Sequence, residues 1–158
     1  MRIGIGYDIH RFGQRPPLIL GGVSLPEAPR LEGHSDGDAL LHAVADAVLG
    51  AAALADIGEH FPDDDPRWED ADSALILAEA LRLARDERRL QPVNVDVNVV
   101  AERPRLAPYR EAIRARLAEL LGLPEDAVGV KARTAEGLGP VGRGEAIEVH
   151  AAVLMERK

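Results

Sequence analysis

Residues 1–10 read MRIGIGYDIH, and hydrophobic side chains occupy every second position. Isoleucine or tyrosine stands at positions 3, 5, 7 and 9, with glycine, charged residues or histidine between them. This period of two is typical of a β-strand. Because alternate side chains of a strand leave the same face, Asp8 and His10 point the same way. The first ten residues therefore predict a strand that presents two polar side chains together.

Further strands and helices follow along the chain. Alternating or β-branched runs predict strands over 18–22, 92–101, 128–133 and 146–155. Capping residues and apolar spacing predict helices from about 38 to 53, from 73 to 89 and over 108–121. Segments 24–34, 56–70 and 134–144 are expected to be loops because they are rich in Pro, Gly or Asp.

The order of these elements predicts an α+β fold, an α/β sandwich. We expect a single mixed sheet of four to five strands, covered by helices on one face, in one domain spanning residues 1–158. The last strand has few polar residues, so the other face of the sheet is expected to pack around an oligomer axis.

The composition excludes several classes of protein. The chain of 158 residues has no cysteine, which excludes disulfide frameworks, thiolate metal sites and cysteine nucleophiles. With 19 basic and 27 acidic side chains its net charge is −8, and no basic block predicts nucleic-acid binding. No apolar run is long enough for a membrane span, and no signal-peptide core is apparent. A cytoplasmic protein is predicted.

Asp8, His10 and His42 form a candidate metal site. Two ligands from a strand and one from a helix would leave a tetrahedral ion with an open position, as in catalytic zinc sites. Asp38 and Asp46, four residues on either side of His42, are candidates to orient its second ring nitrogen. The alternative is that the Asp-x-His spacing arises by chance and that His42 faces solvent.

Two other segments carry residues suited to phosphate chemistry. His34 and Ser35 precede a helix start, where backbone N–H groups favour anions, although they could be ordinary loop and cap residues. Residues 131–139 end a strand and open a glycine-rich loop that could cradle a diphosphate, with Glu136 holding a hard cation such as Mg²⁺. The alternative, which the residues alone favour, is an ordinary glycine-rich turn between strands. The acidic run 56–65 decides nothing alone.

Taken together, the motifs resemble the 2-C-methyl-D-erythritol 2,4-cyclodiphosphate synthase family over essentially the whole chain. The motifs that carry the resemblance are Gly6-Tyr7-Asp8-Ile9-His10, Gly33-His34-Ser35-Asp36-Gly37-Asp38, Leu41-His42-Ala43, Asp56-Ile57-Gly58, Phe61-Pro62-Asp63 and Gly142-Arg143-Gly144-Glu145. The resemblance implies an enzyme of the non-mevalonate isoprenoid pathway. In that reaction the 2-phosphate of 4-diphosphocytidyl-2-C-methyl-D-erythritol 2-phosphate attacks the β-phosphorus, closes a cyclic diphosphate and expels CMP.

The resemblance also implies metals, partners and roles for individual residues. It implies Zn²⁺ on Asp8, His10 and His42, Mg²⁺ or Mn²⁺ on Glu136, and a homotrimer with active sites between subunits. His34 and Thr134 would position and stabilise the reacting phosphorus. The residues implied to bind substrate are Ser35, Asp56, Ile57, Gly58, Phe61 and Asp63 on the methylerythritol side, and Ala101, Pro104, Arg105, Ala107, Arg133, Ala135 and Pro140 on the cytidine side.

Arg143 is expected near the threefold axis, where family members can hold an isoprenoid diphosphate. Arg105, Arg133, Ala135 and Pro140 depart from the residues usual in the family, which makes the cytidine side the less typical half of the site. Two other functions remain open at this point. One is a zinc-dependent phosphohydrolase that releases CMP without ring closure, and the other is a trimeric protein that only binds a prenyl diphosphate.

Overall fold

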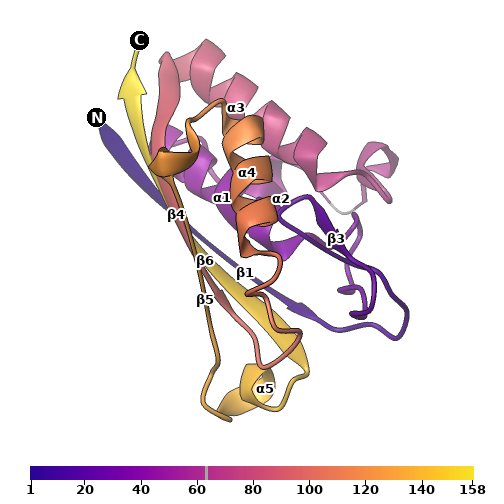
Figure 1. Ribbon diagram of the computed structural model, residues 1–158. Helices are drawn as coiled ribbons and strands as arrows, with labels where there is room; N and C mark the ends of the chain where they lie inside the picture. The colour runs from indigo at the N-terminus through magenta and orange to yellow at the C-terminus, as the bar shows by residue number, and fades with distance from the viewer. Residues whose placement is uncertain (63) are drawn as a thin grey trace.

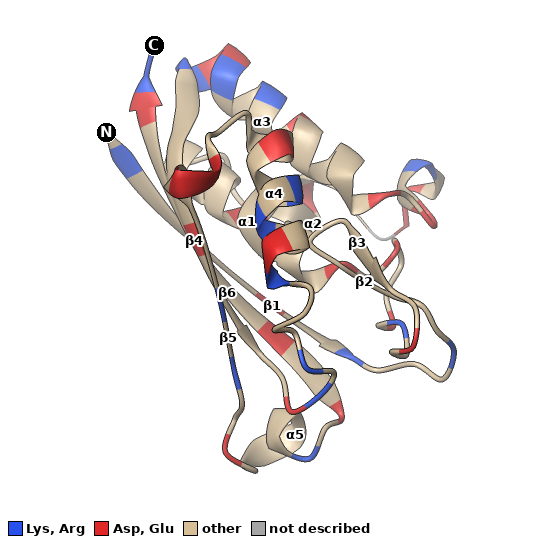
Figure 2. Cartoon of the chain, viewed as in Figure 1, with Lys and Arg blue, Asp and Glu red and all other residues tan. Residues whose placement is uncertain are grey.

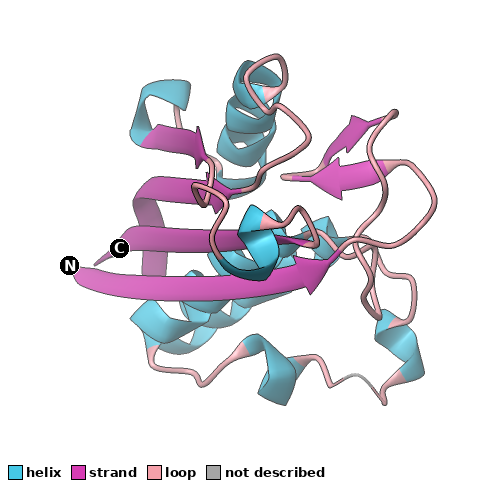
Figure 3. Ribbon diagram, turned by 90° about the horizontal axis from the view of Figure 1, so that it is seen from below, coloured by secondary structure: helices cyan, strands magenta, loops and turns pink. Residues whose placement is uncertain are grey.

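The strand predicted at the N-terminus lies at one edge of a mixed sheet. The computed structural model describes residues 1–62 and 64–158. Its sheet has the order β1–β6–β4–β5, formed by β1 (Arg2–Arg11), β6 (Ala146–Arg157), β4 (Leu90–Val100) and β5 (Val128–Arg133). β6 is antiparallel to both neighbours, whereas β5 is parallel to β4. Figure 3 shows these strands side by side, with the two termini next to each other.

Helices α1 (Ala39–Ala52), α3 (Ser73–Arg88) and α4 (Arg110–Leu121) cover one face of this sheet (Figure 1). The strand residues that face them are buried and apolar, including Val95, Val97 and Val99 of β4. The predicted α+β fold, with helices on one face of a mixed sheet, is confirmed. Within the described residues, no helix is long and apolar enough to cross a membrane.

Helix α1 lies unusually close to β1 because glycines line the contact. A Cβ atom added to Gly4 would sit 1.8 Å from the carbonyl oxygen of Ala47, and one added to Gly6 would sit 1.9 Å from that of Ala43. Only glycine permits this approach of helix backbone to strand backbone. The contact sets the height of α1 above β1, and with it the position of every α1 side chain near that strand.

The large apolar residues of β1 face away from the helices. Ile3 and Ile5 are 72% and 78% exposed, and Tyr7 and Ile9 are also exposed. In the antiparallel register Ile3 lies opposite Leu154 and Ile5 opposite Ala152, so an apolar strip crosses from β1 to β6. The strand alternation was predicted correctly, but its apolar side is the uncovered face of the sheet.

Asp38 fixes the start of α1. Its fully buried carboxylate caps the helix by accepting hydrogen bonds from the backbone N–H groups of Leu40 and Leu41. It also accepts from Gly21 at 2.9 Å and from Gly22 at 2.7 Å, in the turn between β2 (Leu18–Leu20) and β3 (Val23–Leu25). One side chain therefore ties the helix to a hairpin far from it in sequence.

Several loop predictions were wrong in detail. β3 pairs with β2 in a separate hairpin within the segment predicted as a loop from residue 24. The acidic segment contains α2 (Ile57–His60) and the 3₁₀ turn η1 (Pro66–Trp68), and the glycine-rich loop contains α5 (Gly139–Gly142). A second 3₁₀ turn, η2 (Glu125–Ala127), precedes β5. These elements are three or four residues long, too short for hydrophobic periodicity to identify.

Candidate metal centre and substrate cavity

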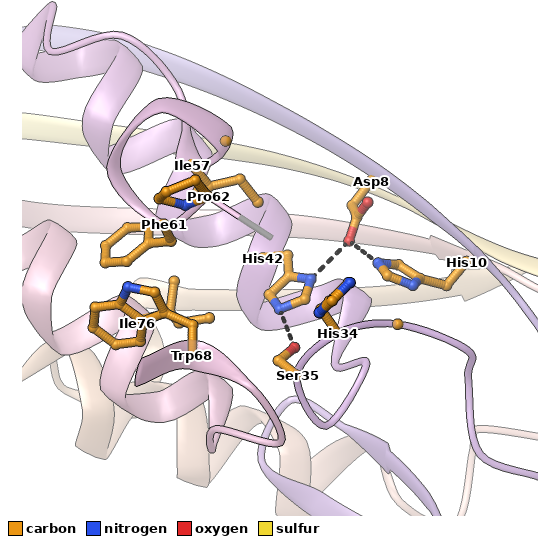
Figure 4. Close-up of a pocket in the computed structure, with 12 residues that line it drawn as sticks. Asp8, His10, His34, Ser35, His42, Ile57, Phe61, Pro62, Trp68 and Ile76 are labelled. Carbon is orange, nitrogen blue, oxygen red and sulfur yellow. Dashed lines mark hydrogen bonds and ion pairs between the residues drawn. The ribbon is translucent and has the colours of Figure 1, made fainter. Parts of the chain in front are cut away.

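Asp8, His10 and His42 converge on one point between β1 and α1 (Figure 4). An Asp8 carboxylate oxygen, Oδ2, lies 2.9 Å from Nε2 of His10 and 3.1 Å from Nδ1 of His42. Donor atoms of the three residues all lie within 4.8 Å of one another. Asp8 and His10 leave the same side of β1, and His42 reaches them because Gly6 allows α1 to approach. The three side chains meet although 34 residues separate Asp8 from His42.

Neighbouring groups orient two of these side chains. His10 Nδ1 lies 2.5 Å from the backbone carbonyl oxygen of Glu32 and donates to it, which turns Nε2 toward Asp8. The other carboxylate oxygen of Asp8, Oδ1, accepts from the N–H of Ile9 at 2.9 Å. Carbonyl and carboxylate partners of this kind commonly hold metal-ligating histidines in place.

Electrostatics within the cluster favour a charged carboxylate. Burial of Asp8 favours its protonated form, but hydrogen bonds from His10 and His42 outweigh burial and lower its pKa to about 2. Burial of His10 favours the neutral ring, but the hydrogen bond and charge of Asp8 outweigh it and raise the pKa of His10. A negative oxygen facing two imidazoles is a donor set that attracts a cation.

The donor geometry fits a metal ion. Two donors bound at about 2.1 Å to a tetrahedral zinc ion lie roughly 3.4 Å apart. The observed separations from Asp8 to the two histidines, 2.9 and 3.1 Å, are close to this spacing, so small side-chain movements would admit an ion. Two imidazoles and one carboxylate suit zinc and other first-row divalent ions, and three protein ligands leave a position for a substrate oxygen.

The cluster opens into a cavity of about 400 Å³. The residues that line it are Asp8, His10, Gly33, His34, Ser35, His42, Ile57, Gly58, Phe61, Pro62, Trp68 and Ile76. His34 and Ser35 lie beside the metal cluster, as Figure 4 shows. Ile57, Gly58 and Phe61, predicted on the substrate side, are part of the same cavity.

The wall opposite the metal cluster is apolar. Phe61 and Trp68 pack edge to face, with ring centroids 4.8 Å apart and an angle of 87° between the rings. Ile76 of α3 completes this wall (Figure 4). Sequence reasoning missed Trp68 and Ile76. One signal was available: Trp68 is the single tryptophan of the chain and lies in a polar, acidic segment with few apolar neighbours in sequence, which would suggest a role in a binding site.

Asp56, predicted to bind substrate from the acidic segment, lies outside the cavity lining. Asp56 caps α2 by accepting from the N–H of Glu59 at 3.0 Å, and it is not among the residues that line the cavity. Asp63 lies outside the described residues. Figure 2 shows acidic residues, coloured red, along the chain between α2 and α3. Pro62 and Trp68 of this stretch line the cavity. A polyanionic ligand would be repelled there unless cations offset the charge.

The expectation that Asp38 or Asp46 orients His42 is wrong. Asp38 is engaged by backbone N–H groups at the helix start, and Asp46 accepts from the N–H of Ile57 at 3.2 Å. The second ring nitrogen of His42, Nε2, instead lies 3.0 Å from the hydroxyl oxygen of Ser35 and 2.9 Å from that of Ser73. Ser73 had no predicted role beyond starting α3.

A second, smaller cavity of about 210 Å³ gathers most residues predicted on the cytidine side. Its lining includes Ala101, Pro104, Arg105, Ala107, Arg133 and Thr134, together with Glu102, Leu106, Arg110 and Ala132. The parallel pairing of β4 with β5 brings the two segments together, because Val100 lies opposite Arg133. Thr134 and Glu136 lie outside the metal cavity. Within one chain, the predicted metal side and the predicted cytidine side of the site are therefore separate.

Glu102 holds the loop after β5. Its Oε1 atom accepts from the N–H of Ala135 at 3.0 Å and from that of Gly137 at 3.3 Å. Between these two residues, Glu136 adopts a left-handed backbone with φ of 54°. The Thr134 hydroxyl donates to Glu136 Oε1 at 3.0 Å. This anchoring role of Glu102 gave no signal in the sequence, because it depends on the pairing of β4 with β5.

Pro140 and Arg143 lie in and directly after α5, outside both cavities. The Arg143 guanidinium is 58% exposed and pairs with Glu145, whose carboxylate lies 2.7 Å from Nε. Within one chain, neither residue reaches the metal cluster or the second cavity.

Comparison with known proteins gives consistent relatives. The 2-C-methyl-D-erythritol 2,4-cyclodiphosphate synthase of Gloeobacter violaceus is 58% identical over 99% of this chain and 95% of that protein. The bifunctional IspDF of Campylobacter jejuni has a TM-score of 0.94 at 39% identity, over 99% of this chain and 42% of that longer one. A CDP-bound structure of 2C-methyl-D-erythritol-2,4-cyclodiphosphate synthase has a TM-score of 0.90 at 39% identity, over 98% of this chain and all of that one. Because the YgbB family model also matches residues 1–156, the chain belongs to the YgbB family.

Proposed function

We propose that this protein forms 2-C-methyl-D-erythritol 2,4-cyclodiphosphate, the product for which its relatives are named. The substrate is 4-diphosphocytidyl-2-C-methyl-D-erythritol 2-phosphate, and the second product is CMP. The observation that carries the proposal is the convergence of Asp8, His10 and His42 on one cavity in a member of this family. We propose that residues 1–158 form a single domain. The protein is proposed to act in the cytoplasm.

The reaction needs positioning more than acid–base chemistry. An oxygen of the 2-phosphate forms a bond to the β-phosphorus, while the bond from that phosphorus to the oxygen bridging to the α-phosphorus breaks. The electron pair leaves with CMP, so no proton has to be removed from the nucleophile. The protein must hold attacking and leaving oxygens in line and offset their negative charge.

The metal cavity suits the methylerythritol end of the substrate. Phe61, Trp68 and Ile76 form an apolar wall against which a branched carbon chain can pack. His34 and Ser35, on the other side, offer donors to phosphate oxygens, and Asp56, Gly58 and Asp63 are proposed to hold the sugar alcohol. Asp8, His10 and His42 would hold Zn²⁺, and Glu136 would hold Mg²⁺ or Mn²⁺ with the diphosphate. When bound, these ions would polarise phosphoryl oxygens and neutralise developing charge.

The second cavity suits the cytidine end. Arg105 and Arg133 bring positive charge to its lining, and Ala101, Pro104 and Ala107 give it small or rigid walls. Thr134 also lines this cavity, and its hydroxyl is proposed to contact the phosphorus that changes bonds. Ala135 follows on the loop anchored by Glu102, and Pro140 lies further along the same connection. We propose that this cavity takes the nucleotide from a substrate whose other end lies in a neighbouring subunit.

A homotrimer would complete the site in this way. The exposed apolar strip around Ile3 and Ile5 supports an interface on the uncovered face of the sheet. Native mass spectrometry should give three times the chain mass, and replacing Ile5 by Glu should yield monomers. Arg143 is proposed to lie near the trimer axis and to meet an isoprenoid diphosphate there. Native spectra of the purified trimer that show no such ligand would count against that occupant.

Phosphorus NMR tests the reaction directly. The purified protein is incubated with the cytidyl substrate, Zn²⁺ and Mg²⁺, beside an EDTA-treated control. Two coupled diphosphate signals of the cyclic product should appear together with CMP and be absent with EDTA. CMP with an open-chain bisphosphate would instead identify a phosphohydrolase. Prenyl diphosphate binding without turnover would identify a binding protein.

A further inference from the structure

His42 has a second contact surface, on the side turned away from Asp8. There its Nε2 atom lies 2.9 Å from the hydroxyl oxygen of Ser73 and 3.0 Å from that of Ser35. Ser73 is the first residue of α3 and is fully buried, whereas Ser35 lines the metal cavity. The imidazole of His42 therefore lies between the metal cluster and two serine hydroxyls, as Figure 4 shows for Ser35.

Asp36 determines where the Ser73 hydroxyl hydrogen points. Ser73 donates twice to this carboxylate, through its hydroxyl to Oδ1 and through its backbone N–H to Oδ2 at 3.1 Å. The backbone N–H of Asp36 donates in turn to the carbonyl oxygen of Ala71 at 3.1 Å. This bond also fixes the position of Asp36 relative to the start of α3. A carboxylate only accepts hydrogen bonds, so the single hydroxyl hydrogen of Ser73 is used on Asp36.

The remaining capacity of the Ser73 oxygen fixes the tautomer of His42. That oxygen has only lone pairs left to offer, so Nε2 of His42 must carry its hydrogen and donate to it. In a neutral imidazole the other nitrogen, Nδ1, then has the lone pair. Nδ1 is the atom that faces Asp8 Oδ2 at 3.1 Å, where a metal ion would be bound. With an ion bound between Nδ1 and Asp8, the lone pair of Nδ1 is used on the metal, whereas the opposite tautomer would set the Nε2 lone pair against that of Ser73 and leave the metal without this ligand.

Ser35 does not determine the tautomer in the same way. Its oxygen accepts from the N–H of Gly37 at 3.3 Å and lies 3.4 Å from that of Ser73. Its hydroxyl hydrogen can turn toward Ser73 or toward a ligand in the cavity that Ser35 lines. Ser35 can therefore either donate or accept, and only Ser73 has its role imposed by a charged neighbour.

We propose that Asp36 and Ser73 are positioning residues that hold His42 as the Nε2–H tautomer, so that Nδ1 is ready to ligate the metal ion. Neither residue touches the metal or the substrate. The inference rests on the metal site of the proposed function. It adds a carboxylate–hydroxyl–imidazole connection assembled from three segments of the chain, at residues 36, 42 and 73.

Zinc affinity is the first test. Zn²⁺ dissociation constants are measured by chelator competition for the wild type, Ser73→Ala, Ser73→Thr and Ser35→Ala. Loss of a group that orients a metal ligand typically weakens binding about 10- to 100-fold, and Ser73→Ala should fall in this range. Ser73→Thr keeps the hydroxyl and should restore most of the affinity. Ser35→Ala should weaken binding much less than Ser73→Ala. Wild-type affinity in a folded Ser73→Ala protein would overturn the proposal.

The tautomer itself can be observed in the wild type, which removes any dependence on how the variants fold. Nitrogen-15 NMR of the zinc-loaded protein should show a proton on Nε2 of His42 and metal coordination through Nδ1. A proton on Nδ1 would overturn the proposal. Failure of the proposed function would give a different result. The tautomer and the order of the zinc affinities would be as expected, but no cyclic product would form.

Discussion

The metal cavity and the cytidine-side cavity are built in opposite ways. The metal cavity is lined by residues of β1, α1, α2 and α3, and the buried Ser73 contacts His42 from behind. The cytidine-side cavity lies where β4 and β5 end, and several of its residues, including Arg105 and Arg133, are exposed. The first brings three donor residues together within one chain, whereas the second is a shallower, partly exposed cavity. In the proposed function, the metal site is therefore complete within one chain, while the nucleotide site is completed by a neighbouring subunit.

Removing a ligand of the metal cavity should cause the largest loss of zinc and of turnover. His42→Ala leaves two of the three protein ligands, so zinc should be lost. Loss of the charge stabilisation that a metal supplies, about 4 kcal/mol, corresponds to about a thousandfold lower turnover. Zinc content and phosphorus NMR measure both effects. His60→Ala is the matched control, since His60 contacts the carbonyl oxygen of Leu54 outside the metal cluster and should leave zinc and turnover unchanged.

Gly6→Ala tests whether the close contact of α1 with β1 builds the metal cavity. The added Cβ would lie 1.9 Å from the carbonyl oxygen of Ala43, so α1 must move and carry His42 away from Asp8. We expect a loss of about 3 kcal/mol in the free energy of unfolding, together with weaker zinc binding.

Gly50→Ala is the control for this experiment. Gly50 lies in the same helix, and its added Cβ would have its nearest neighbour, the carbonyl oxygen of Ile5, at 3.7 Å, an ordinary contact. This variant should gain about 0.5–1 kcal/mol, because alanine favours a helix. Urea denaturation of the metal-free proteins compares the two. Equal stabilities would contradict the role assigned to the glycine contact.

A smaller effect is expected at the cytidine-side cavity. Glu102→Ala removes the acceptor that Ala135 and Gly137 share, so the loop bearing Thr134 and Glu136 loses its anchor. Because the loop is exposed, we expect a cost near 1.4 kcal/mol, seen as about a tenfold higher KM for the cytidyl substrate. Zinc affinity should not change. Glu102→Gln keeps a carbonyl acceptor and should recover part of the loss. An unchanged KM, or a loss of zinc, would contradict the assignment of separate roles to the two cavities.

The elements that follow hydrophobic periodicity were predictable from the sequence. The strand over 1–10 and the helices starting at Ala39 and Ser73 appear close to their predicted bounds, since period and capping residues are local signals. β3 was not predictable in this way, because a three-residue strand depends on its pairing with β2. The orientation of β1 was equally hidden. Its isoleucines face outward because its glycines are needed against α1, a tertiary requirement.

In the candidate site, too, local sequence signals predicted some residues and tertiary contacts determined the others. Asp8, His10 and His42 were chosen from residue type, spacing and resemblance, and the structure brings them together. The partners of His42 were predicted as Asp38 and Asp46, four residues to either side, whereas the observed partners Ser35 and Ser73 are 7 and 31 residues away. Helical spacing finds only neighbours on one element. Trp68 and Glu102 were missed for the same reason, since their roles depend on contacts between distant segments.

Mixed trimers test most directly whether the two cavities belong to one shared site. His42→Ala subunits, defective in the metal cavity, are unfolded and refolded in equal amounts with Glu136→Ala subunits, defective in the loop. If each site combines the metal cavity of one subunit with the loop of the next, about a quarter of the sites regain both intact halves. Phosphorus NMR should then show about a quarter of the wild-type rate, from two proteins that are each inactive alone. No recovery in verified mixed trimers would mean that each chain works alone and would contradict the account.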